Sequence, residues 1–412
     1  MGVEKSRIHR PSFLDDDESW SLFCKYAFYA SKGICDDQQF ENVGRDIVQK
    51  CGGLPLAIKT IAALLSQKRH FLVEWKNIYR GFHELTARGQ VSSVIACLQL
   101  SYNALPVHLK QLFLCFSIYP EDFEIPAEQL VLWWIGEGFI RGKDSKTAIE
   151  LGFEEGRQKL TSESRRLGFT SEKSTKSLKN CPKLRALLMM SSIQGLCCDD
   201  MESLSFLRVL DLSYFELATT AVQDLLKWIV SLKHLAYLNL SGVRGIGELP
   251  SSIKKLRNLQ VFVLYENETE VLSKLKKLKV LELNAQYCKD HNTLMMLDDL
   301  HPPPSLQKLY IGGSHCETLP AWINPEKLSN LQYISIQDSD INFFETSPQS
   351  VNGRLFTWNV EGLCFKNLQR LKLDWKNLEE DMPLLRNAEV RNCFNFRNFP
   401  HPNKFVWRKG EE

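Results

Sequence analysis

The 412-residue sequence has no apolar run long enough to span a membrane, and its amino-terminal region lacks the apolar core of a secretory signal peptide. With 51 Lys and Arg against 49 Asp and Glu, the formal net charge is only +2, so overall charge does not favour nucleic acid or an anionic membrane. The twelve cysteines show no zinc-binding spacing with histidine. We therefore expect reduced, mostly buried thiols in a globular, cytoplasmic chain of two or three domains.

Motifs of the common catalytic classes are also missing from the sequence. It contains no G-x-S-x-G, no H-E-x-x-H and no protein-kinase set. His315 and Cys316 are adjacent but have no further ligands at zinc spacing, and acidic pairs such as Asp199-Asp200 lie in connecting segments. We therefore expect that the protein is not an enzyme and that it has neither a catalytic residue nor a metal site.

The first residues, MGVEKSR, match the pattern M-G-x-x-x-[ST], with Ser6 at the last position. This pattern predicts N-myristoylation of Gly2, and a chance match is the alternative. Membrane binding is expected only if Gly2 carries the lipid, because one acyl chain gives marginal, reversible anchoring.

Apolar residues at helical spacing dominate the first part of the chain. Residues 13–30 repeat them at i, i+3, i+4, i+7 and i+8 from Trp20 to Phe28, which predicts one buried helix face. A second helix is expected over 36–50. The Gly52-Gly53 pair then ends that helix, and Pro55 fits the first turn of a third, which we expect to be almost wholly buried from Leu56 onward.

Residues 94–140 predict two helices across a tight turn, a pattern typical of a winged-helix unit. The second of these helices, Ala127 to Glu137, contains Trp133 and Trp134 but no Lys or Arg. A helix that reads DNA bases needs basic or amide side chains toward the groove. This helix is therefore expected to serve as a packing surface, and we expect no nucleic-acid partner.

From residue 184 onward the pattern L-x-x-L-x-L, or a near variant, recurs nine times. The segments begin at Leu184, Leu207, Leu235, Leu259, Leu278, Leu306, Leu331, Leu368 and Leu385. Their starts are 23, 28, 24, 19, 28, 25, 37 and 17 residues apart, and the 37-residue gap is expected to hold a loop that leaves the array. One leucine-rich repeat cannot bury its own apolar face, so nine are expected to stack into a solenoid.

Residues between the leucines of each strand are expected to point onto a concave sheet that binds a protein partner. Tyrosine and arginine are frequent anchors in protein interfaces, although each position alone is also compatible with a solvated sheet surface. The predicted partner-binding residues are Asp211, Tyr237, Asn239, Tyr265, Glu282, Lys308, Tyr310, Tyr333, Arg370 and Lys372.

Four stretches together resemble plant intracellular nucleotide-binding leucine-rich-repeat immune receptors, most closely the coiled-coil class. They are GGLPLA at 52–57, LSYNALPVHLKQLFLCFSIYPEDFEI at 100–125, LWWIGEGFI at 132–140 and SFLDDDESWSLFCKYAF at 12–28. The resemblance implies a helical remnant of the nucleotide-binding module with a partial winged helix, followed by a leucine-rich-repeat horseshoe. By this likeness, Gly53, Leu54, Pro55 and Leu56 correspond to residues that line the family's ADP or ATP pocket.

The resemblance also implies a domain order along the chain. We expect the end of the nucleotide-binding module over 1–90, a partial winged-helix-like domain over 91–160, a linker over 161–183, repeats over 184–400 and a tail over 401–412. The sequence contains no G-x-x-x-x-G-K-[ST] phosphate loop and no Met-His-Asp motif of the family. The wing of the winged helix is expected to be missing near Glu155 to Thr161.

The function implied by the resemblance is plant innate immunity, with protein recognition through the repeats and without an autonomous nucleotide switch. Expected partners are a pathogen effector, a guarded host protein or a full-length receptor of the same class, and no cofactor is expected beyond ADP or ATP by resemblance. Two alternatives stay open. The chain is either an ADP/ATP-binding switch whose phosphate loop is absent from this sequence, or a nonfunctional receptor fragment.

Overall fold

The computed structural model describes residues 12–68, 71–87, 92–119, 123–139, 165–169, 175–189, 201, 203–214, 222–243, 246, 249–265, 272–284, 300–314, 317–344, 349–351, 354–400 and 405–409. Its contacts divide the chain into two compact units, Met1–Gln111 and Leu112–Glu412. Within the described ranges, no helix is both long and apolar enough to cross a membrane.

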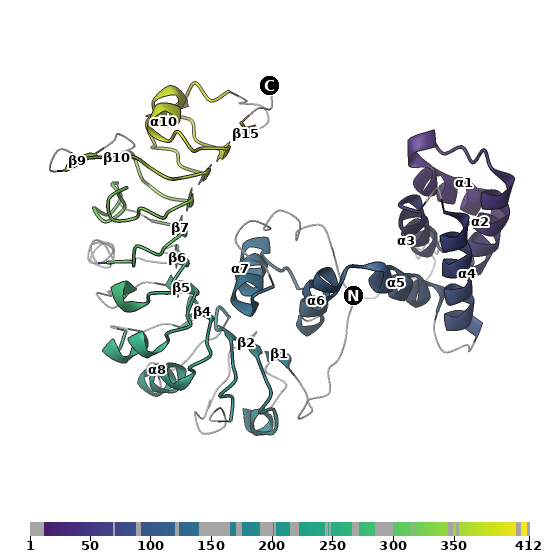
Figure 1. The fold of residues 1–412 in the computed structure, drawn as a ribbon, viewed down its shortest axis with the longest axis horizontal. Coiled ribbons are helices and arrows are strands. Elements are labelled where there is room, and N and C mark those ends of the chain that lie inside the picture. The colour runs from purple at the N-terminus through teal and green to yellow at the C-terminus, as the bar shows by residue number, and fades with distance from the viewer. Residues whose placement is uncertain are drawn as a thin grey trace, which may run out of the picture. The chain divides into compact units, whose positions relative to one another are not determined.

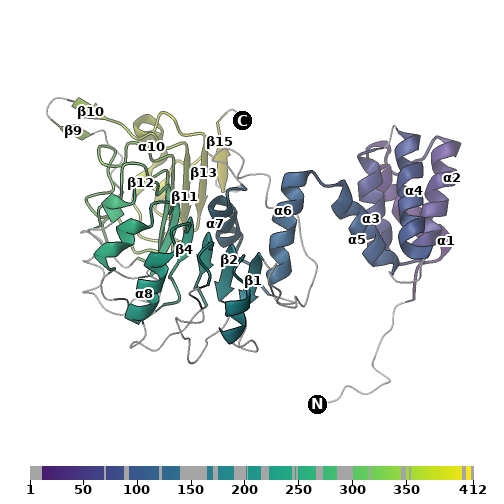
Figure 2. The same ribbon diagram turned by 60° about the horizontal axis from the view of Figure 1, so that its bottom comes forward.

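The N-terminal unit is a bundle of helices (Figures 1 and 2). Its helices are α1 (Asp16–Ala27), the 3-10 turn η2 (Tyr29–Ser31), α2 (Gln38–Lys50), α3 (Pro55–Ser66), α4 (Leu72–Ala87) and α5 (Ser93–Ala104). Helix α3 packs against α1 and α5, and α4 packs against α2 and α5. Asp15 begins α1 with a capping box, since its carboxylate accepts from the Glu18 N–H at 2.8 Å.

An aromatic cluster forms the centre of this bundle. The ring of Trp75, which is fully buried, meets Phe23 edge-on at 5.8 Å and Phe40 edge-on at 5.0 Å. Phe23, Cys24 and Ala27 are buried on α1, so the helix face predicted from the sequence is confirmed.

The Gly-Gly turn before α3 holds the start of the described chain. Gly53 has a φ of +70°, and its carbonyl accepts from the Leu14 N–H at 3.0 Å. A Cβ at Gly53 would overlap the Leu14 carbonyl, so both the backbone angle and the space require glycine here. Leu56, which we expected to be buried, is 57% exposed because it points away from the buried stripe that contains Ile58 and Ile61.

The second unit is built on one long sheet, whose strands line the inner side of an arc in Figure 1. Helix α6 (Val107–Cys115) spans the division between the units, and the 3-10 turn η3 (Phe116–Ile118) and α7 (Ala127–Glu137) follow it. The strands of the sheet, in order, are β1 (Arg166–Phe169), β2 (Ala186–Met189), β3 (Val209–Asp211), β4 (Tyr237–Asn239), β5 (Val261–Tyr265), β6 (Val280–Asn284), β7 (Lys308–Gly312), β8 (Tyr333–Gln337), β11 (Gly362–Lys366), β13 (Asn387–Arg391) and β15 (Val406–Arg408).

Each strand pairs in parallel with the next, except that β15 runs antiparallel to β13. Short elements occupy the connections: η4 (Thr175–Asn180), α8 (Val222–Ser231), η7 (Ser251–Lys255), η8 (Leu272–Lys274) and α10 (Trp375–Asp381). Two small strand pairs stand apart from the main sheet, β9 (Gln349–Val351) with β10 (Arg354–Phe356) and β12 (Leu373–Asp374) with β14 (Phe396–Arg397). The β9–β10 hairpin lies in the predicted 37-residue gap.

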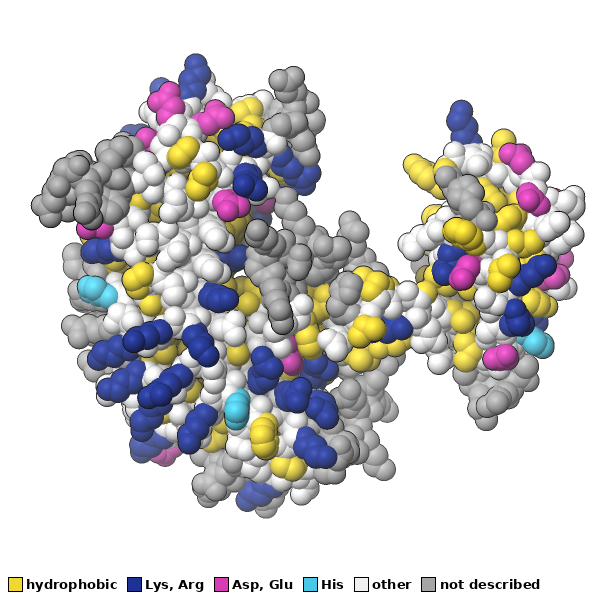
Figure 3. Space-filling model, viewed as in Figure 1, with side chains coloured by type: hydrophobic (Ala, Val, Ile, Leu, Met, Phe, Trp, Pro, Cys, Tyr) yellow, Lys and Arg dark blue, Asp and Glu magenta, His cyan; other side chains and the backbone are white. Residues whose placement is uncertain are grey.

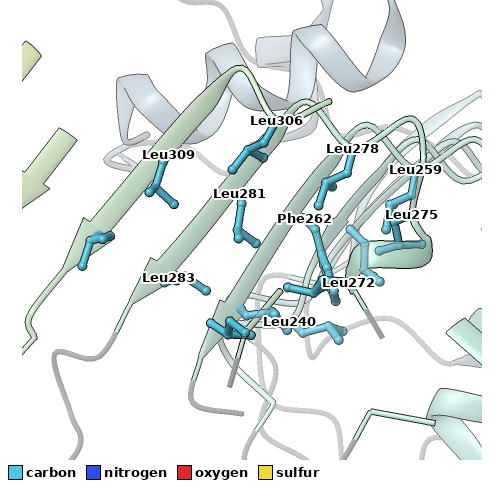
Figure 4. Close-up of a cluster of buried hydrophobic side chains, with 14 of the residues drawn as sticks. Leu240, Leu259, Phe262, Leu272, Leu275, Leu278, Leu281, Leu283, Leu306 and Leu309 are labelled. Carbon is cyan, nitrogen blue, oxygen red and sulfur yellow. The ribbon is translucent and has the colours of Figure 1, made fainter. Parts of the chain in front are cut away.

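Leucines at equivalent positions of successive repeats stack into a continuous core (Figure 4). On neighbouring strands, Phe262, Leu281 and Leu309 are each 0% exposed and lie in register. The repeats thus bury one another's apolar faces, which confirms the predicted solenoid.

One repeat differs from its predicted alignment. The sheet strand is β11, whose repeat begins with the buried Val360, and not the segment that begins at Leu368. With Val360 in the first position, the intervals from Leu331 and to Leu385 become 29 and 25 residues. The irregular intervals of 37 and 17 therefore arose from a misplaced repeat, because Leu368 and the leucines after it imitate the motif.

The ends of the sheet also differ from the predicted domain limits. Strand β1 lies in the stretch expected to be a linker, and β15 lies in the expected tail, where it covers the edge of β13. Residues 91–160 do not share one unit either, because α5 packs in the N-terminal bundle and α7 packs on the sheet. The predictions for Gly2 and for the wing near 155–161 lie outside the described residues.

Candidate functional site: the concave face of the repeat sheet

Side chains on the concave face form columns that run across the strands in register. One column contains Arg166, Ala186, Val209, Tyr237, Val261, Val280, Lys308, Tyr333, Gly362 and Asn387. The next contains Gly168, Leu188, Asp211, Asn239, Val263, Glu282, Tyr310, Ser335, Cys364 and Glu389. Both columns change from mostly apolar to mostly polar near β6.

The apolar half of the concave face is covered by α7. This helix contacts β3, β4 and β5, and both views of the ribbon show it against the inner side of the sheet (Figures 1 and 2). Trp133 and Trp134 are each 1% exposed. Trp134 meets Phe116 edge-on at 6.0 Å, so η3 packs against this helix. The expected packing role of this helix is confirmed by its burial.

The beginning of α7 is attached to the sheet by Gln129. The side-chain amide of Gln129 donates to the Asp211 carboxylate at 2.8 Å and to the Ser213 hydroxyl at 2.9 Å. The same carboxylate accepts from the Tyr237 hydroxyl at 2.8 Å and from the Asn239 amide at 3.3 Å. Asp211 is 2% exposed, so its charge depends on these donors.

The end of α7 is attached through Glu137. Its carboxylate lies 3.3 Å from Nε of Arg166 on β1, and the Glu137 side chain is only 3% exposed. The Arg166 guanidinium also stacks 5.1 Å from the ring centre of Phe139. Between the two attachments, Gly136 faces Tyr237 on β4 so closely that a Cβ at position 136 would overlap the Cβ of Tyr237.

Burial beneath α7 shows that the prediction was wrong for three of the partner-binding residues. Asp211, Tyr237 and Asn239 are 2%, 0% and 4% exposed, and their polar groups bond to one another or to Gln129. Burial and the neighbouring Asp211 carboxylate raise the pKa of Tyr237 well above its ordinary value. These residues hold the chain's own helix and are not available to another protein.

Among the described helices, α7 contacts β3, β4 and β5 and leaves the polar half of the concave face open from β7 onward. Tyr310 and Tyr333 lie 5.4 Å apart, ring centre to ring centre, on adjacent strands. Gly362 follows on β11. A Cβ at this position would lie 2.8 Å from the Tyr333 ring, so the absence of a side chain leaves the space that the ring occupies. Partial burial lowers the pKa of the neighbouring Lys308. Glu282 is partly exposed at the border with the covered half.

A charged cluster follows the tyrosines toward the end of the sheet. The Glu389 carboxylate lies 2.6 Å from Arg391 and 3.5 Å from Lys366, and the Cys364 thiol is 3.9 Å from the same carboxylate. Cys364 and Lys366 were missing from the predicted residues because this repeat was placed at Leu368, whereas Glu389 and Arg391 lie in the correctly predicted repeat at Leu385 and were not included. The glycine and alternating apolar residues of Gly362–Lys366 were the available signal.

The misplaced repeat also explains two of the three remaining predicted positions. Arg370 and Lys372 lie after β11 and outside the concave columns, and Arg370 is 60% exposed near Glu317 and Asp340 at 3.9 and 3.8 Å. They are therefore wrong as members of the concave face. Tyr265 belongs to β5, but its side chain lies outside the described part of the structure.

The predicted nucleotide-pocket residues lie in the N-terminal unit at the turn before α3. Gly53 and Leu54 are half-buried there, whereas Pro55 and Leu56 are exposed. Among the described residues, no three His, Cys, Asp or Glu side chains are grouped so that they could hold a metal ion.

Taken together, the parallel strands and stacked leucines define a leucine-rich-repeat protein with an N-terminal helical region. Residues 265–352 match the family of R13L1/DRL21 leucine-rich repeats. Across 95% of this chain, the sequence is 27% identical to disease resistance RPP13-like protein 4 of Arabidopsis thaliana. Disease resistance protein RPP8 of the same plant is 26% identical over 83% of the chain, and RPM1 is 35% identical over 33%.

The chain is a homologue of plant disease-resistance proteins of the coiled-coil nucleotide-binding leucine-rich-repeat family, with repeats of the R13L1/DRL21 type. It spans 61%, 44% and 15% of the lengths of these three relatives. Among solved structures, a leucine-rich-repeat protein of Leptospira interrogans is 21% identical with a TM-score of 0.36, over 56% of this chain and 53% of that one.

Proposed function

We propose that the chain contributes to plant disease resistance by binding a protein partner on the open half of its concave sheet. The observation that carries this proposal is the contrast between the two halves, since α7 covers the apolar half and does not reach the half-buried Tyr310 and Tyr333. Tyrosines give a large contact area with little loss of side-chain entropy, and solenoids present such faces to partners. A pathogen effector, a guarded host protein and a full-length receptor are the partner classes considered.

The charged residues on the open half favour a partner surface that has both apolar and charged side chains. Lys366 and Arg391 flank Glu389 at one end, and Lys308 lies beside the tyrosines. An aromatic centre with a charged border is the usual arrangement of a protein-binding surface. We propose binding and no catalytic activity for this face, and we place it in the cytoplasm because the described cysteines are free thiols.

The proposed recognition does not depend on a nucleotide bound by this chain alone, because the sequence contains no phosphate loop. The exposed Pro55 and Leu56 favour the alternative in which this turn completes a nucleotide pocket. Titration of the purified chain with ADP separates the two. Saturable binding that is lost in Pro55→Ser would favour the nucleotide switch.

The proposal is tested by affinity purification from pathogen-challenged leaves that express the tagged chain. The variant Tyr310→Ala/Tyr333→Ala is compared with Lys227→Ala, a change on α8 where the side chain is 76% exposed. We expect specific partners to be lost from the tyrosine variant and kept by the α8 variant, with a parallel loss of resistance to pathogen growth. The proposal fails if the same partners and the same resistance persist in the tyrosine variant.

A further inference from the structure

Basic side chains are concentrated at the end of the sheet where the strands begin, in the first repeats. We call this end the amino-terminal edge of the sheet. Lys and Arg gather over the lower part of the repeat unit in Figure 3, although the net charge of the whole chain is only +2. A hollow of about 620 Å³ opens there. It is lined by Arg165, Lys183, Arg185, Phe206, Arg208, His234, Ala236, Asn258 and Gln260.

Three of these arginines occupy equivalent positions on successive rungs of the solenoid. The carbonyls of Arg165, Arg185 and Arg208 accept from the first strand residue of the following repeat, at 3.1, 2.9 and 2.9 Å. Neighbouring strands are about 4.8 Å apart, so the three guanidinium groups leave the sheet edge from adjacent positions. Like charges on adjacent strands repel one another and destabilise the sheet.

No described acidic side chain compensates these three arginines with an ion pair. Arg165 and Arg185 are exposed, and Arg208 is half-buried. Two acidic residues of these repeats lie outside the hollow: Asp211 is beneath α7, and Asp224 is on α8. The hollow therefore concentrates positive charge that an external anion can neutralise.

The floor of the hollow adds a flat aromatic surface. Phe206 is 59% exposed, and its ring stacks on that of His234 at a centroid distance of 5.9 Å and an angle of 16°. A volume of about 620 Å³ lies within the range of small-molecule sites. Guanidinium groups bind phosphate through two parallel hydrogen bonds, which a single rigid fork provides.

We propose that this hollow binds a ligand that carries several phosphate groups. Arg165, Arg185 and Arg208 bind the phosphates, and the Phe206–His234 stack contacts the body of the ligand. A second hollow, which shares Gln260 with the first, is lined by Lys276, Lys277 and Lys279. The same chemistry is available from a soluble polyphosphate and from a phosphorylated lipid headgroup at a membrane.

Two probes distinguish these sources. Isothermal titration of the full chain with sodium tripolyphosphate measures the soluble ligand, and flotation with phosphatidylcholine vesicles, with or without phosphatidylinositol bisphosphate, measures the headgroup. We expect saturable binding that weakens with added salt, because the interaction is between charges near the surface. Binding to tripolyphosphate identifies a soluble source. Binding only to the vesicles that contain phosphatidylinositol bisphosphate identifies a lipid.

The variant Arg165→Gln/Arg185→Gln removes two exposed charges from the hollow and is expected to weaken binding at least tenfold. Its matched control is Arg386→Gln/Lys409→Gln, which removes two charges from the same edge at the far end of the sheet, where Arg386 precedes β13 and lies 3.9 Å from Glu361. Equal melting temperatures establish that both variants fold. The proposal is overturned if neither probe binds, or if both variants lose the same affinity.

Discussion

Gly136 on α7 lies directly against Tyr237 on β4, with no room for a Cβ between the two residues. On one side of this contact Gln129 bonds to Asp211, and on the other Glu137 pairs with Arg166. One helix thus covers the apolar half of the concave sheet, held by polar contacts near both ends and by a close approach of its last turn to β4. The arrangement leaves the other half of the concave face as the proposed partner site.

Gly136→Ala is expected to displace α7, because the new methyl group overlaps Tyr237 within two packed elements. Hydrogen exchange should rise in the α7 peptide, and the melting temperature should fall by several degrees. Gly81→Ala is the matched control, since Gly81 is also helical and its Cβ would meet only the flexible end of Leu100 at 3.1 Å. Unchanged exchange in α7 of the Gly136 variant would contradict the contact.

Asp211→Ala is expected to destabilise the repeat unit by about 3 kcal/mol, because it removes the carboxylate that accepts from the buried Tyr237 hydroxyl and from the Gln129 amide. Urea unfolding measures the change. Asp224→Ala provides the comparison, since Asp224 is 66% exposed and pairs only with the exposed Lys227. Its loss should cost less than about 1 kcal/mol. Equal losses in the two variants would show that the Asp211 network does not stabilise the fold.

Stability is expected to fall above about pH 10, in part because of Tyr237. Its folded pKa is raised by burial and by Asp211, so below the unfolded pKa both states keep the proton and stability is fully present. Above that value the unfolded chain ionises and the folded one does not, which favours unfolding. Compared with Tyr237→Phe, the wild type should lose up to about 1.4 kcal/mol more per pH unit. Parallel pH profiles for the two proteins would argue against a buried phenol.

Buried thiols are expected to resist alkylation in the native chain. Burial raises the pKa of Cys24 to about 11 and the pKa of Cys115 to about 12, and the thiolate is the reactive species. At pH 8, iodoacetamide should leave both unmodified until urea unfolds the chain, while the half-exposed Cys35 reacts earlier. Peptide mass spectrometry reports each site separately. Native-state labelling of Cys24 at the rate of Cys35 would disprove its burial.

Local periodicity predicted most of the fold. The apolar face of α1, the start of α3 at Pro55 and most sheet strands follow from spacings of 3.6 or 2 residues, which need no knowledge of distant contacts. The repeat at Val360 was missed for a physical reason. Valine fills the first core position as well as leucine does, whereas the leucines from 368 onward fit the same written pattern.

The cover formed by α7 could not be deduced from local spacing, because it joins Gln129 to Asp211 across 82 residues of sequence. A signal did exist in the strands themselves. Val261, Val263 and Val280 occupy outward positions that a solvated face would fill with polar residues, and all three are buried. Strands that are apolar on both faces are typical of sheets covered on both sides. This pattern predicts a covering element, although it does not identify which one.

The most direct test introduces one additional cysteine into either half of the concave sheet and compares how fast the two introduced cysteines are labelled. Val209→Cys replaces a fully buried residue beside Tyr237, and Arg391→Cys replaces an exposed one on β13. With maleimide labelling followed by peptide mass spectrometry, position 391 should react rapidly and position 209 slowly, and adding Gly136→Ala should accelerate position 209. If positions 209 and 391 react at the same rate in the otherwise native chain, α7 does not cover the sheet and the account is wrong.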